Sequence, residues 1–156
     1  MMKGKRLLAL LLAAVLAAGV LTACGGPGTS AGVKLNTGTI EQMLETEGVT
    51  AAVAADGELS AAVDEVAASL AQCTLEEIGR LDVKSMVAQK AGVRPLVCEV
   101  YGDSYWISTP LGYTSRRERT AAGLIDDLGA GSYHVAAAIF VEQGGQRQIL
   151  FAVTAA

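Results

Sequence analysis

The segment from Tyr133 to Thr154 limits the possible folds more than any other part of the chain. It holds two apolar β-type runs, Tyr133–Glu142 and Arg147–Thr154, around Gly144-Gly145, a pair typical of tight hairpin turns. The side chains that would point to either face of this hairpin are apolar, whereas a sheet with one face in water alternates polar and apolar residues. Both faces therefore need a cover, which favours an antiparallel sheet between two layers of helices.

Helices that could form these layers are expected upstream of the hairpin. Apolar residues at helical spacing predict helices over Ile40–Glu47 and over about Glu58–Gln72. The capping box Thr74-x-x-Glu77 opens a third helical piece, which either continues past Gly79 or restarts at Asp82. These patterns supply at least one helix for each face.

The region after Arg94 carries a mixed signal. The short β-type runs Leu96–Tyr101 and Ser104–Ser108 flank Gly102-Asp103 and predict a further hairpin. A second capping box, Ser115-x-x-Glu118, then opens a helix that Gly129 ends. Taken together, the patterns predict an α+β fold, a three-layer α/β/α sandwich with a small antiparallel sheet.

The N-terminal segment has the features of an export signal. Three basic residues in Met1–Arg6 precede an apolar run from Leu7 to Val20. That run is shorter than the about 20 residues that a membrane-spanning helix needs. The ending Leu21-Thr22-Ala23-Cys24 resembles the lipobox of bacterial lipoproteins, which implies cleavage before Cys24 and a lipid on its sulfur. We therefore expect a signal peptide over residues 1–23 and an extracytoplasmic protein that this lipid anchors to the membrane.

The remaining 133 residues, from Cys24 to Ala156, suit one domain. Residues 24–38 are rich in Gly, Ser and Thr and are expected to form a flexible tether, so the single domain would span residues 39–156. Nine basic and sixteen acidic residues follow Ala23, which gives this part a net charge of −7. An acidic domain of this kind argues against nucleic acid as a partner, and it has no polybasic patch for anionic lipids.

Two cysteines remain besides Cys24. A disulfide between Cys73 and Cys98 would close a loop of about 25 residues and could stabilise an exported domain by about 3 kcal/mol. The alternative is two separate buried thiols, which behave as small apolar residues. The sequence leaves both possibilities open.

Several segments resemble the CAP superfamily of cysteine-rich secretory, antigen 5 and pathogenesis-related proteins, called SCP-like in bacteria. That family opens with a helix, a Gly-hydrophobic turn and the pattern D-x-x-L-S-x-A-A at its second helix. The matching residues here are Gly48-Val49, Asp56, Leu59, Ser60, Ala61, Ala62 and Ala67. Later, the run Ser115-Arg116-Arg117-Glu118-Arg119 followed by Leu124 resembles the family's S-x-x-H-R-x-x-x-L. The resemblance covers residues 40–156 and implies the same α/β/α sandwich.

The departures from the family pattern bear on function. The family cleft holds two histidines and two acidic residues, which bind a divalent metal in some members. Glu118 stands where the family has a histidine, and Glu99, in a segment similar to the family's G-E-N-I, is a candidate for one acidic position. The resemblance thus implies a degenerate cleft lined by Glu99, Glu118 and Arg119. No cofactor, metal or catalytic residue is expected in it.

A second candidate surface comes from the aromatic residues. Tyr101, Tyr105 and Trp106 lie close together in the chain and could form a binding surface with Arg116. Alternatively, the rings pack on the core with their polar tips in water, and the arginines are a solvated helix face.

These observations favour a non-catalytic surface lipoprotein whose CAP-like domain binds a partner or supports the cell envelope. The partner could be an envelope protein, a glycan or a small ligand. Two alternatives stay open. One is a residual metal-dependent or hydrolytic domain that uses Glu99 and Glu118, and the other is an unrelated accessory lipoprotein of the envelope.

Overall fold

The structure, a computed structural model, describes residues 26–103 and 116–156 and contains five strands and five helices in these ranges. In chain order they are β1 (Ser30–Val33), α2 (Thr37–Thr46), β2 (Ala51–Ala54), α3 (Gly57–Leu70), α4 (Leu75–Gly79), α5 (Val83–Ala91), β3 (Val97–Gly102), α6 (Arg116–Asp126), β4 (Gly131–Val141) and β5 (Arg147–Ala155). The mixed α+β class predicted from the sequence is confirmed.

The strands form one open sheet, which is antiparallel except for one pair. The order is β1-β4-β5-β3, and β2 also pairs with β4, in parallel. β1 and β2 lie on the same edge of the long strand β4, because β1 pairs with residues 137–140 and β2 with residues 131–134. The closing hairpin is confirmed, with β4 and β5 paired antiparallel from Tyr133↔Ala155 to Val141↔Arg147.

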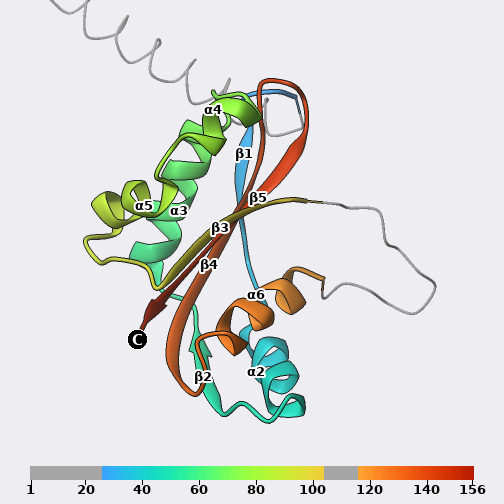
Figure 1. The fold of residues 1–156 in the computed structure, drawn as a ribbon, viewed down its shortest axis with the longest axis vertical. Helices are drawn as coiled ribbons and strands as arrows, with labels where there is room; N and C mark the ends of the chain where they lie inside the picture. The colour runs from blue at the N-terminus through green and yellow to red at the C-terminus, as the bar shows by residue number, and fades with distance from the viewer. Residues whose placement is uncertain (1–25, 104–115) are drawn as a thin grey trace, which may run out of the picture.

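Each face of this sheet carries its own apolar cluster. Side chains of Val135 and Ala137 in β4 join the cluster with α2 and α6, whereas Ala136 and Ala138 join the cluster with α3, α4 and α5. Figure 1 shows the two groups of helices on either side of the strands. Phe151 and Phe140, one in each cluster, are at most 1% exposed. Burial of a side chain of this size contributes about 2–3 kcal/mol.

Short polar side chains set the starts of four helices. Asn36, Asp56, Thr74 and Asp82 accept a backbone N–H from the first turn of α2, α3, α4 and α5, respectively. Thr74 and Glu77 form the predicted capping box, and the third helical piece restarts at Asp82, as α5. Gly92 ends α5 with a φ of 70°, a conformation that glycine adopts without strain.

Several expectations need correction or lie outside the described residues. The tether over residues 24–38 is wrong in its second half, because β1 pairs with β4 and Leu35 is only 8% exposed. The first helix begins one turn earlier than expected, with Asn36 as its cap. Strand β2 was not expected at all. The predicted strand Ser104–Ser108 and the cap Ser115 lie outside the described ranges.

Candidate functional site

Glu118 is the most enclosed of the candidate cleft residues. It lies in the first turn of α6, and only 8% of its surface is exposed. Its Oε1 accepts the N–H of Asn36 at 3.0 Å, and Asn36 caps α2 by accepting the N–H of Thr39. Because a helix N-terminus carries a partial positive charge, a carboxylate at this place stabilises α2. The other oxygen, Oε2, has no hydrogen-bond partner among the described residues.

Glu99 and Tyr101 lie on β3 and face the same layer as Glu118. Glu99 is paired in register with Phe151, and the Tyr101 ring meets the Phe151 ring edge-on at 6.1 Å between centroids. Phe151 belongs to the cluster under α2 and α6, which places all three side chains on that face. Burial, followed by the nearby carboxylates of Glu99 and Asp127, raises the pKa of Tyr101. Glu99 and Glu118 thus share a face, without a hydrogen bond between them in the described part of the chain.

Asp103 forms a cluster with two arginines that no sequence motif predicts. Its carboxylate, 8% exposed, accepts from Arg117 Nη2 at 3.0 Å and from Arg147 Nε at 2.9 Å. Asp103 directly follows β3, Arg117 lies in the first turn of α6, and Arg147 is the first residue of β5, so one carboxylate joins three elements. No local sequence signal marks this contact, since Arg147 reaches Asp103 only through the pairing of β3 with β5.

The candidate binding surface is described only in part. Tyr101 is 38% exposed, and Arg116 and Arg119 are exposed on α6. Tyr105 and Trp106 lie outside the described residues. The structure therefore brings Tyr101 and the arginines to neighbouring elements, β3 and α6, and says nothing of the other two rings.

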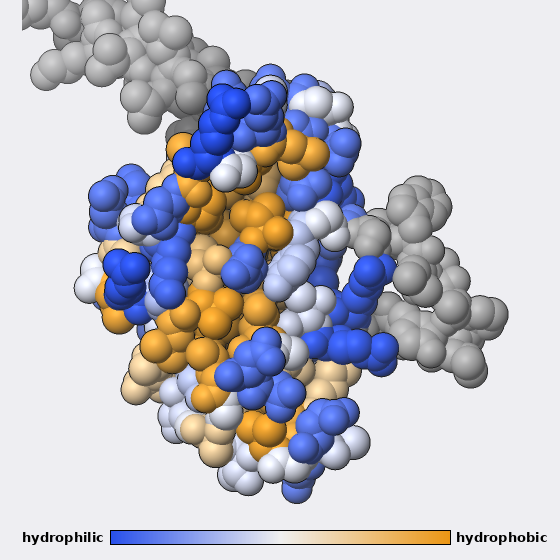
Figure 2. Space-filling model, viewed as in Figure 1, coloured by the Kyte–Doolittle hydropathy of each residue, from blue (hydrophilic) through white to orange (hydrophobic). Residues whose placement is uncertain are grey.

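An apolar band marks the surface near β3. β3 is an edge strand of the described sheet, since it pairs with β5 alone. Leu96, just before it, and Tyr101 are 43% and 38% exposed. Figure 2 shows apolar side chains along the middle of the face on which β3 crosses the front of the molecule, with hydrophilic residues on both sides. Exposed apolar surface beside an unpaired strand edge is typical of contact sites for partners.

Cys73 and Cys98 are free thiols in the structure. Cys73 follows α3 and Cys98 lies in β3, and both pack half-buried against the cluster under α3 and α5. Burial, followed by the charge of Glu99, raises the pKa of Cys98 to about 12. Its thiol is therefore protonated at neutral pH and is a weak nucleophile.

His134, near the start of β4, lies within ion-pair distance of Asp56. The Nδ1 atom of His134 lies 4.0 Å from Oδ2 of Asp56, which caps α3 through its other oxygen. The side chain of His134 is 32% exposed. Because Asp56 accepts the N–H of Leu59 as the cap of α3, its position is explained without a catalytic role.

Among residues 26–103 and 116–156, no group of three or more His, Cys, Asp or Glu side chains is arranged to hold a metal ion. Nor does any helix in these ranges have the length and apolar character that crossing a membrane requires.

Comparison with known proteins finds no matching family model, curated protein or solved structure. The likeness to the CAP superfamily therefore depends on the residues quoted above.

Proposed function

We propose that the protein is an extracytoplasmic lipoprotein, anchored to the membrane by a lipid on Cys24. The observation that carries this proposal is the sequence Leu21-Thr22-Ala23-Cys24 directly after a basic and then apolar segment. A contact of Gly28 is compatible with this anchor. Gly28 N–H donates to Val141 at 2.9 Å, so a residue only four positions after the expected lipid attachment site is bonded to the domain.

For the domain itself, we propose a non-catalytic, degenerate CAP-like sandwich. Helices against both faces of the sheet support this fold. So does the position of Glu118, in the first turn of the helix where the family carries its histidine. Glu118 uses one oxygen to hold Asn36, and Glu99 is exposed beside Tyr101. The hydrogen bond to Asn36 accounts for the position of Glu118, and exposure to water accounts for that of Glu99. Neither position requires a bound substrate.

The contact surface of such a binding domain would be the edge of β3 with Tyr101 and the neighbouring Arg116. A metal-dependent or hydrolytic function would instead depend on the oxygen of Glu118 that has no partner in the described residues. One oxygen is a weak basis for it, because calcium and magnesium sites need several converging oxygen ligands. An accessory role in an envelope complex stays compatible with the same surface.

Incorporation of labelled fatty acid into the full chain in a bacterial host tests the anchor. The wild type and Cys73→Ala should incorporate the label, whereas Cys24→Ala should not, because the acyl chains would be attached through the Cys24 sulfur. Cys73→Ala is the matched control, since it removes a thiol of the folded domain. A wild type without label, or a Cys24→Ala chain that keeps it, would contradict the proposal.

A further inference from the structure

One end of the domain lies close to the expected lipid attachment site. Residues Gly26–Thr29 form a turn in which Thr29 Oγ1 donates to the carbonyl of Gly26 at 2.7 Å. Gly28 N–H donates to Val141, and Gln72 Nε2 donates to the carbonyl of Gly28 at 3.2 Å. An extended chain spans at most about 3.6 Å per residue, so Cys24 and Gly28 are within about 14 Å of each other.

The elements around Gly28 form one surface, here called the turn end. It consists of Gly26–Thr29, the connection Ala71–Leu75 and the β4–β5 turn Glu142–Gln146. Gln143 holds the last two together, since its N–H donates to Cys73 at 3.0 Å and its side-chain amide to Ala71 at 2.9 Å. In Figure 1 the β4–β5 turn, α4 and the start of β1 lie at one end of the molecule, and α2 and β2 lie at the other.

The turn end shows little charge in an otherwise acidic domain. Its single acidic or basic residue is Glu142, which is 2% exposed. The Glu142 carboxylate accepts the N–H groups of Gln146 and Gly144, each at 2.8 Å. These donors lower its pKa and keep the charge covered by backbone.

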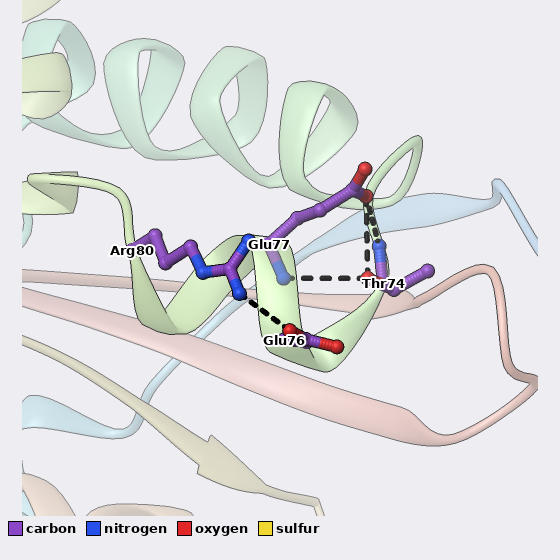
Figure 3. A network of polar contacts seen from close by, with 4 residues as sticks. All are labelled: Thr74, Glu76, Glu77 and Arg80. Carbon is purple, nitrogen blue, oxygen red and sulfur yellow. Dashed lines mark hydrogen bonds and ion pairs between the residues drawn. The ribbon is translucent and has the colours of Figure 1, made fainter.

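The neighbouring charges of α4 are also satisfied within the helix. Figure 3 shows Arg80 paired with Glu76, and Glu77 bound to the backbone N–H and the hydroxyl of Thr74. Leu75 beside them is 39% exposed. The opposite end presents acidic side chains to water, among them Glu45, Glu47 and Asp127.

We propose that the turn end rests on the headgroup layer of the membrane that holds the lipid of Cys24, with the side chain of Leu75 among the headgroups. The headgroup layer is about 5–8 Å thick on each side of a bilayer, so a reach of about 14 Å leaves the turn end little distance from it. A domain with a net charge of −7 is repelled by anionic lipids, and the turn end is the surface that can approach with the least repulsion. The edge of β3 and the acidic end then stay accessible to a partner.

This inference rests on the proposed anchor, and the experiment separates the two. The full lipidated protein, with Cys73→Ala and Cys98→Ala, is reconstituted into phosphatidylcholine vesicles that carry a headgroup-attached quencher. A fluorophore is placed at Gln146→Cys in the turn end or, as the matched control, at Glu47→Cys at the opposite end. Both positions are exposed.

We expect most of the fluorescence at position 146 to be lost and that at position 47 to be largely retained. Insertion of about twelve Gly and Ser residues after Gly25 should reduce the loss at position 146, since such a linker adds about 20 Å of average reach. Equal quenching at both positions in protein that floats with the vesicles overturns this orientation alone. Protein that does not float overturns the anchor and the orientation together.

Discussion

At the level of single residues, the carboxylate of Asp103 connects β3, α6 and β5. Substituting this residue therefore tests how these elements are held together. Asp103→Asn keeps the shape but weakens the bonds from Arg117 and Arg147. We expect a loss of about 2 kcal/mol in the free energy of unfolding, as is usual for hydrogen bonds between charged groups. Chemical denaturation measures it.

The matched control for Asp103 is Glu76→Gln. It breaks an ion pair with Arg80 whose side chains are both about three-quarters exposed. Exposed pairs contribute little, so the change should stay within about 0.5 kcal/mol. Equal losses for the two variants would show that the Asp103 cluster does not hold the elements together.

Glu142 predicts a pH dependence of stability. Backbone N–H groups hold its pKa below the ordinary value of 4.5, so the folded state binds its proton less readily than the unfolded state. The stabilisation is present above that value and is lost as the pH falls through the lowered pKa. Glu142→Gln should therefore lower the melting temperature at pH 7, because the amide nitrogen cannot accept an N–H, and the gap to the wild type should close in acid.

Melting curves between pH 7 and pH 3 check this expectation for Glu142. Glu47→Gln, on the exposed end of α2, is the control and should follow the wild type throughout. A gap that stays constant down to pH 3 would contradict the assigned contacts of the Glu142 carboxylate.

At the level of elements, replacing a glycine by alanine should have opposite effects on stability at the end of α5 and at the start of α3. Gly92 has a φ of 70°, which costs alanine about 1 kcal/mol, whereas Gly57 begins α3 with a helical backbone. A Cβ would meet no atom within 4 Å at either site, so backbone conformation decides the outcome. Gly92→Ala should destabilise, and Gly57→Ala should be neutral or stabilise by about 0.5 kcal/mol. Equal effects in denaturation would contradict the geometry.

The elements that the sequence predicts well are those whose signal is local. β4 and β5 are long, apolar on both faces and joined by a short turn, and α3 carries an unbroken apolar stripe from Leu59 to Leu70. β1 and β2 have four residues each, are rich in Ala or Gly and form only by pairing with β4. Gly and Ser in β1 resemble a linker, so pairing with a distant strand overrides the local preference.

In the candidate site, too, features with a local sequence signal could be predicted, whereas those that depend on distant contacts could not. The sequence predicts a helix through Glu118, and the structure places Glu118 in the first turn of α6. Its burial against Asn36 and the link from Asp103 to Arg147 depend on how α6 and β5 pack, which no local pattern encodes. The part of Tyr105 and Trp106 in a binding surface stays a prediction, since both lie outside the described residues.

At the level of the whole molecule, the proposed lipid on Cys24 would place an acidic domain close to a membrane, since only four positions separate Cys24 from Gly28. In the part of the chain that the structure describes, Gly28 N–H donates to Val141, and Thr29 closes a turn onto Gly26. This placement depends on the proposed cleavage before Cys24 and on the proposed lipid at that residue.

Mass spectrometry of the N-terminal peptide of the protein isolated from bacterial membranes tests this claim most directly. We expect a chain that begins at Cys24 and carries the added mass of a lipid on that residue. A chain that still holds residues 1–23, or one that begins elsewhere with Cys24 unmodified, would contradict it.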